Sequence, residues 1–168
     1  MLKHVNLWPL LTNFQTFNEC TKRYLNTLIE IGNQSAMFYL GSHLFFTYNE
    51  GKKGLHLLQM AAKSTRHQAL YNYSIALSMT DSAKAIDIFS QLITTTKEAS
   101  TSNYRNIVAL LMEQRTNRRQ PFYNKCWTIT EGHWDKDWMT VHNQETKSIT
   151  CIYCKLDLEV MKICIGLP

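Results

Sequence analysis

Apolar residues recur every three or four positions from about Thr16 to Arg115. This spacing is the period of amphipathic helices, in which one face of each helix packs on the core. No comparable stretch alternates strictly between apolar and polar residues, which would indicate a β-strand. The pattern therefore predicts an all-α region built from six helices. They are expected at residues 17–31, 34–48, 52–64, 67–79, 81–93 and 102–115.

Polar residues between these segments supply the signals that start and stop the helices. Gly32 is expected to end the first helix and Asn33 to cap the second, because glycine is favoured just after a helix and asparagine at its N-cap. The loop at residues 49–51 separates the second helix from the third, and Asp81 is expected to cap the fifth. Short loops between helices of similar length suggest a repeated unit.

The chain aligns with itself at a spacing in the low thirties. Residues 36–41 return 33 positions later as residues 69–74, and residues 54–58 return as residues 85–89. Helix–loop–helix units with this period are typical of tetratricopeptide arrays. Small residues such as Gly41 are expected to let paired helices approach closely. The repeat therefore predicts a stack of about three helical hairpins.

Four motifs follow one another in this region. They are Gly32-Asn33, Ala36-x-Phe38-x-Leu40-Gly41, Gly54-Leu55-x-x-Leu58-x-x-Ala61-Ala62 and His67-x-Ala69-x-Tyr71. Their order and spacing resemble the Sel-one-like subclass of tetratricopeptide repeats, in the form carried by plant F-box proteins. The segment 151–160, which begins Cys-x-x-Cys, is similar to the closing segment of that group.

This resemblance implies a substrate-recognition region of an SCF-type ubiquitin ligase. In that setting the partners would be the substrate protein, a Skp-family adaptor and a cullin. No F-box is found in the sequence itself. The adaptor and the cullin are therefore expected as partners only if an F-box lies upstream.

The chain is expected to divide into a linker at residues 1–16, a helical-repeat domain at 17–119 and a tail at 120–168. The tail holds four of the five cysteines and three of the four tryptophans. A helical period returns only near its end. We therefore expect an irregular, cysteine-containing tail that ends in a short helix at about residues 156–164.

Composition and charge narrow the classes of function. The net charge of +5 comes from 18 basic and 13 acidic residues, and this mild excess does not predict nucleic-acid binding. No apolar run approaches the roughly 18 residues that a membrane span needs, and the N-terminus lacks the apolar run of a signal peptide. These observations predict a cytoplasmic or nuclear protein with reduced thiols and no membrane contact.

The spacing of Cys151 and Cys154 is that of a metal knuckle, because two thiolates two residues apart can reach one tetrahedral ion. Cys126 together with His133 or His142 could complete a structural zinc site. Such a site would require the three sulfurs to lie within about 4 Å of one another. In the alternative interpretation the cysteines are packing residues, and the closing helix docks on the sixth helix without metal.

Motifs of known catalytic sites are not found. None of the six histidines stands at a recognisable spacing from a nucleophile. The serine-hydrolase, zinc-protease and phosphate-loop motifs are absent from the sequence. His67 occupies the repeat's own histidine position, which favours a structural role. We therefore expect a non-enzymatic protein without a catalytic cofactor.

Partner binding is expected along the first helix of each hairpin, which lines the groove of such arrays. The candidates there are Phe38, Ser42, Phe45 and Tyr71, with a protein or peptide as partner. Packing between repeats is the alternative role for these four residues. A second hypothesis makes the tail the active part, as a small zinc-binding regulatory or interaction domain that the helices only support.

Overall fold

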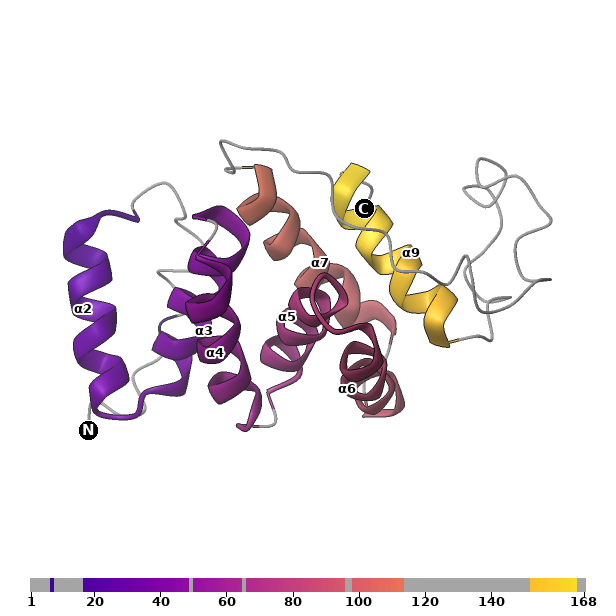
Figure 1. Ribbon diagram of the computed structural model, residues 1–168, viewed down its shortest axis with the longest axis horizontal. Helices are drawn as coiled ribbons and strands as arrows, with labels where there is room; N and C mark the ends of the chain where they lie inside the picture. The colour runs from indigo at the N-terminus through magenta and orange to yellow at the C-terminus, as the bar shows by residue number, and fades with distance from the viewer. Residues whose placement is uncertain are drawn as a thin grey trace.

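The computed structural model describes residues 7, 17–48, 50–64, 66–95, 98–113 and 152–165. Its helices stand beside one another in an extended row, with α2 at one end and α9 towards the other (Figure 1). They are α2 (Glu19–Glu30), α3 (Gln34–Ser42), η3 (His43–Thr47), α4 (Gly51–Ala62), α5 (His67–Ser78), α6 (Ser82–Thr95), α7 (Glu98–Glu113) and α9 (Ile152–Ile165). The expected all-α fold is confirmed, since the described residues contain no strand.

Two helices begin earlier than the apolar pattern predicts. The helix α7 starts at Glu98 rather than at residue 102, and α9 starts at Ile152 rather than at residue 156. The first turn of α7, residues 98–101, carries no large apolar side chain, so apolar spacing could not mark it. Glutamate and alanine are good helix formers, which explains why the helix extends through this turn.

The turn between α2 and α3 has the geometry expected of Gly32 and Asn33. Gly32 has a φ of 81°, a left-handed conformation that glycine adopts without a steric penalty. The backbone N–H groups of Gly32 and Asn33 donate to the carbonyls of Ile29 and Leu28, so α2 ends in a Schellman motif. The Asn33 side chain then accepts a hydrogen bond from the Ala36 backbone N–H at 2.9 Å and caps α3. Both sequence predictions for this turn are confirmed.

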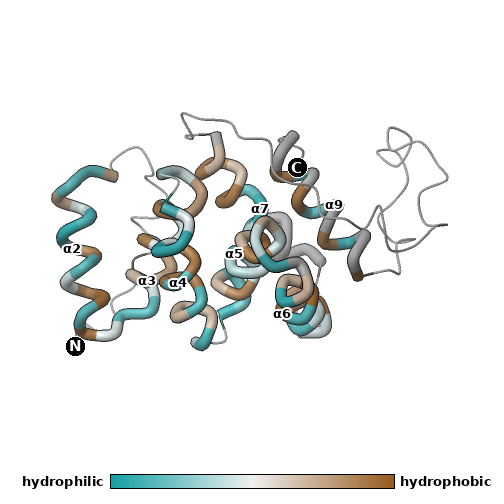
Figure 2. The backbone as a smooth tube through the Cα atoms, in the orientation of Figure 1, coloured by the Kyte–Doolittle hydropathy of each residue, from teal (hydrophilic) through white to brown (hydrophobic). Residues whose placement is uncertain are grey.

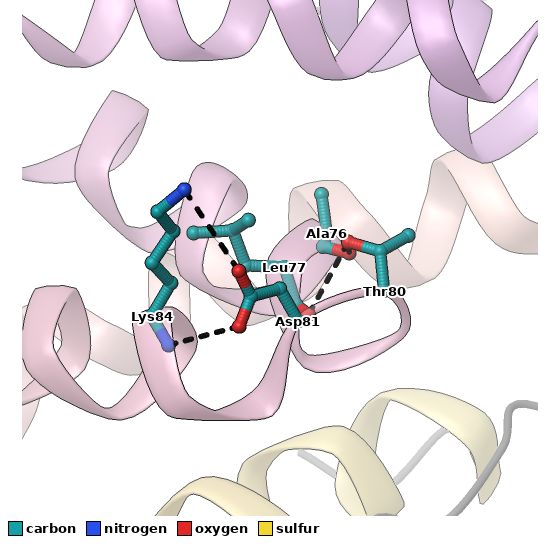
Figure 3. A network of polar contacts seen from close by, with 5 residues as sticks. All are labelled: Ala76, Leu77, Thr80, Asp81 and Lys84. Carbon is teal, nitrogen blue, oxygen red and sulfur yellow. Dashed lines mark hydrogen bonds and ion pairs between the residues drawn. The ribbon is translucent and has the colours of Figure 1, made fainter.

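The turn between α5 and α6 is closed by local polar contacts (Figure 3). The Thr80 hydroxyl donates to the carbonyls of Ala76 and Leu77, each at 3.4 Å, where α5 ends. The Asp81 carboxylate accepts from the Lys84 backbone N–H at 3.3 Å, which confirms Asp81 as the cap of α6. The Lys84 ammonium lies 3.8 Å from the same carboxylate. The chain is thus redirected between α5 and α6 by residues that are close together in the sequence.

The first hairpin, formed by α3 with η3 and by α4, is held together at two glycines. A Cβ atom built on Gly54 would lie 2.6 Å from the Phe45 backbone nitrogen and 2.9 Å from the Gly41 carbonyl oxygen. A Cβ built on Gly41 would lie 3.0 Å from the backbone nitrogen of Leu58. The two helix backbones therefore touch directly, as the prediction of close approach at Gly41 requires.

The second hairpin is formed by α5 and α6, and α4 joins it to the first. Its first helix is buried on every side, because all residues of α5 from Tyr71 to Ser78 are buried. A helix buried all round lies between two layers of structure. Along α2 and α9, by contrast, hydrophilic and hydrophobic residues both recur through the helix, as in helices with one face on the core (Figure 2).

The third pair of helices is α7 and α9, which are separated in the sequence by residues 114–151. About three hairpins were expected between residues 17 and 115. In that range the described helices form two hairpins that are continuous in the chain, and α7 pairs instead with α9, which lies beyond it. The helix α7 packs against η3, α5 and α9 more than against α6, the helix that precedes it. It thus lies across the first helices of both hairpins. None of the described helices is long and apolar enough to cross a membrane.

Candidate protein-binding face

The surface of most interest is the one that α5, α6 and α7 present to α9, which we call the α9-docking face. The helices α5 and α6 form one hairpin, and α7 reaches this face from its contacts with η3 and α5. Three aliphatic residues of α9 are buried here: Leu156, Val160 and Ile163. They stand at positions i, i+4 and i+7 and so share one side of the helix.

One buried ion pair joins α9 to this face. The Arg105 guanidinium of α7 binds the Glu159 carboxylate through two bonds, Nε to Oε2 at 3.0 Å and Nη2 to Oε1 at 2.7 Å. The Arg105 and Glu159 side chains are only 7% and 13% exposed. The Tyr71 hydroxyl of α5 donates to the same carboxylate, with Oη 2.9 Å from Oε2. Three N–H and O–H donors from two helices thus converge on one carboxylate.

The protonation states of this cluster follow from burial and charge. Burial raises the pKa of Tyr71 well above its usual value, and the negative charge of Glu159 raises it further. Burial alone would lower the pKa of Arg105, but the hydrogen bonds and charge of Glu159 outweigh it, so that pKa is raised. Tyr71 is therefore a neutral hydroxyl donor and Arg105 a permanent cation. Both residues therefore act in this cluster as hydrogen-bond donors to one carboxylate.

The four residues expected to line a groove are all buried in the folded chain. Ser42 accepts a hydrogen bond from the Asn72 side chain at 3.0 Å, which ties α3 to α5. Phe45 packs against Gly54 of α4. Phe38 belongs to the hydrophobic core. Tyr71 alone is seen to contact α9, so a partner could reach it only where α9 now lies. Binding through the four residues stays a prediction.

The two charged residues of the cluster were not among the sequence predictions, although the sequence carries a signal for both. Arg105 stands three and seven positions before Val108 and Met112, within the apolar stripe of α7. Glu159 stands between Leu156 and Val160, within the apolar stripe of α9. A charged residue on a buried stripe needs a partner of opposite charge. The contact between α7 and α9 confirms the docking of the closing helix on the sixth helix, and pairing these two charged residues would have supported that prediction.

A second cluster surrounds the π-helix η3. The Tyr48 backbone N–H donates to the His43 carbonyl, five residues earlier, which is the π-helical hydrogen bond. The Phe17 ring stacks on the His43 ring with centroids 4.2 Å apart. Tyr39 and Tyr48 tilt against the same imidazole at 4.9 and 6.5 Å. The imidazole therefore lies in an almost wholly aromatic environment.

We expect the fold to lose stability below neutral pH through His43. Burial lowers the pKa of His43 from 6.5 to about 4. Between these values the unfolded chain binds a proton that the folded chain does not bind. This contribution to stability is complete above pH 6.5 and is lost as the pH falls towards 4. At 1.36 kcal/mol for each pKa unit, the full loss is about 3 kcal/mol.

Urea unfolding at pH 7 and at pH 4.5 measures the effect. The control is His43→Phe, which keeps an aromatic ring against Phe17 but cannot titrate. We expect the variant to lose less stability than the wild type between the two pH values. Equal losses in the two proteins would contradict the assignment to His43.

The metal-site predictions fall largely outside the residues that the structure describes. Cys126, His133, His142 and Cys151 all lie there. Cys154 falls within the first turn of α9, which places it on a helix. In the described part of the chain, no three His, Cys, Asp or Glu side chains lie close enough to hold a metal ion. Zinc binding by the tail stays a prediction, as does the domain boundary at residues 119–120.

A comparison with known families matches residues 7–113 to a family model described as plant tetratrico peptide repeats. The match ends at the last residue of α7 and leaves α9 outside. It starts within the segment predicted as a linker, where Leu7 is buried in the core. No curated protein and no solved structure shows significant similarity to the chain.

Proposed function

This chain belongs to the family of plant tetratrico peptide repeats, and on that premise we propose that it recognises the protein substrate of a ubiquitin ligase. Repeats of this type are protein-interaction modules, because stacked hairpins present a continuous surface to a partner. The observation that carries the interaction function is the stack itself. In it α3 packs on α4, α4 on α5 and α5 on α6, all within the matched residues.

The ligase setting is supported by the sequence rather than by the fold. The motifs from Gly32 to Tyr71 follow the order and spacing of the repeats in plant F-box proteins, and the segment 151–160 resembles their closing segment. A Skp-family adaptor and a cullin would be partners if an F-box accompanies these repeats. The proposed location is the cytoplasm or the nucleus, where such ligases act.

The site chemistry supports recognition rather than catalysis. Arg105, Glu159 and Tyr71 satisfy one another's hydrogen bonds and hold helices together. The proposed role is therefore a non-enzymatic one, in which the chain holds a substrate while other subunits transfer ubiquitin.

The proposal is tested by identifying partners and then measuring what binding does to them. The full chain, tagged and expressed in plant cells, is cross-linked, purified and analysed by mass spectrometry. Each candidate is then purified and titrated into the full chain by calorimetry. We expect at least one partner with saturable binding, and we expect its half-life to lengthen when the chain is depleted from the cells.

The two parts of the proposal fail separately. Absence of saturable binding by any recovered protein would contradict the interaction function. A partner that binds saturably but whose half-life is unchanged on depletion would contradict the ligase role alone. Glu19→Gln serves as a matched control, because Glu19 is a highly exposed carboxylate on α2, away from the α9-docking face.

A further inference from the structure

We propose that the α9-docking face is a binding site for an amphipathic, acidic helix of a partner protein, and that α9 occupies it as an internal ligand. The proposal rests on the interaction function proposed above and names the chemistry of the partner. The partner helix would carry one carboxylate within an apolar stripe, as Glu159 stands among Leu156, Val160 and Ile163 in α9.

The receiving surface lies within the residues that match the repeat family, whereas its present occupant lies outside that match. The helices α5, α6 and α7 all lie within residues 7–113, which match the family. The helix α9 lies beyond that match and follows α7 only after residues 114–151. The α9-docking face is therefore formed by residues that match the family, and a distant segment of the chain, α9, covers it.

The α9-docking face requires that the helix bound to it carries an acidic residue. Arg105 is buried, and its guanidinium directs both Nε and Nη2 at the Glu159 carboxylate. Tyr71 adds a third donor to the same carboxylate. An apolar helix in this place would leave the Arg105 charge buried without a counter-charge, which is strongly unfavourable. Charge thus selects acidic helices over neutral or basic ones.

The apolar part of the α9-docking face sets the spacing of the aliphatic and acidic residues along the bound helix. In α9 the carboxylate stands three residues after one buried aliphatic residue and one and four residues before two others. This is the anchor spacing of a helix laid on an apolar surface. A partner helix with an aliphatic residue at i, an acid at i+3 and aliphatic residues at i+4 and i+7 would place its carboxylate where Arg105 and Tyr71 now bind Glu159.

Among the described side chains of α9, three aliphatic residues are buried, Ile152 packs on the core and one carboxylate is bound by Arg105 and Tyr71. These are non-covalent contacts of a single helix, so a helix with the same anchors can compete for the same face. When α9 leaves, the chain remains connected through residues 114–151, so departure requires no break in the repeat stack. The same face can then accept a helix from another molecule with the same anchors. Removing the Glu159 charge should favour this exchange.

The test uses the full chain and a fluorescein-labelled peptide with the sequence of residues 152–165, under reducing conditions. Binding is measured by fluorescence anisotropy to the wild type and to the Glu159→Gln chain, in which the internal helix is weakened. We expect the Glu159→Gln chain to bind the peptide about tenfold or more tightly than the wild type does, because its own helix competes less. A peptide that itself carries Glu159→Gln should bind about tenfold more weakly.

Two controls separate specific docking from general loosening of the fold. Glu19→Gln removes an exposed carboxylate on α2 and should bind the peptide as the wild type does. A chain with Arg105→Met in addition to Glu159→Gln should lose the preference for the acidic peptide over its Gln form. Circular dichroism of each variant verifies that the repeat helices remain folded.

Several outcomes would overturn the proposal. Equal binding of the peptide by the wild-type and Glu159→Gln chains would show that α9 is a fixed part of the fold. Equal binding of the acidic and Gln peptides would show that the Arg105 and Tyr71 donors do not select the occupant. If the wild type is a dimer and the Glu159→Gln chain is a monomer, the α9-docking face binds α9 of a second copy of the chain. These results do not depend on the partner-binding experiment described above. The interaction function can therefore hold even if the present proposal is wrong.

Discussion

Gly54→Ala is expected to lower the free energy of unfolding by about 1–2 kcal/mol, although alanine is the better helix former. The added Cβ would lie 2.6 Å from the Phe45 backbone nitrogen and 2.8 Å from the Phe45 Cβ. A backbone atom cannot move aside as a flexible side chain can, so α4 and η3 must separate along the whole hairpin. Overpacking of this kind costs about 1–3 kcal/mol or more, which exceeds the roughly 1 kcal/mol gained in helix propensity.

The chain offers a graded series of controls for this prediction. At Gly41 the nearest contacts of an added Cβ would be 3.0–3.1 Å, so Gly41→Ala should fall between the wild type and Gly54→Ala. At Gly51 the nearest atom among the described residues lies 3.9 Å from an added Cβ, which is ordinary contact, and Gly51→Ala should be neutral or slightly stabilising. Urea unfolding of the three variants measures the order. A Gly54→Ala variant as stable as Gly51→Ala would show that the two helices do not cross at Gly54.

Arg105→Met is expected to detach α9 rather than to unfold the whole chain. The substitution leaves the Glu159 carboxylate nearly buried without its counter-charge, and breaking such a pair typically costs about 3–5 kcal/mol. The chain can avoid most of this cost by releasing α9, because Glu159 then returns to water. Hydrogen exchange should therefore accelerate in residues 152–165 while the amides of α4 and α5 keep their protection.

A compensated variant distinguishes the lost charge pair from lost packing. The triple variant Arg105→Met, Glu159→Leu and Tyr71→Phe replaces the polar cluster with apolar groups of similar size. Such replacements are often neutral or stabilising, so α9 should regain protection close to that of the wild type. Continued fast exchange of α9 in the triple variant would mean that the aliphatic anchors are insufficient without the ion pair. Unchanged exchange in Arg105→Met alone would mean that the pair contributes little to docking.

The local elements of this fold follow from residues that are close together in the sequence. The start of α3, for example, depends on Asn33 and the Ala36 N–H, and the end of α2 depends on Gly32. Apolar spacing located every α-helix in the described part of the chain, although it gave α3 and the π-helix η3 as one helix. The 33-residue repeat located the two continuous hairpins. These features were predictable because capping and helical period act over a few residues, and the close approach at Gly41 involves two helices that follow one another in the sequence.

Which helix packs against which other helix is determined by the tertiary structure. An apolar stripe shows that a helix is buried but does not name the helix that covers it, and so α7 lies on η3 and α5 where a regular stack would place it on α6. Arg105 and Glu159 stand 54 residues apart, and although each charge on a buried stripe signals the need for a partner, the sequence does not say which residue supplies it. Their pairing exists because both stripes need a counter-charge and the packing of α9 brings the two together. That same packing buries Tyr71 beneath a helix of its own chain, which no local pattern could indicate.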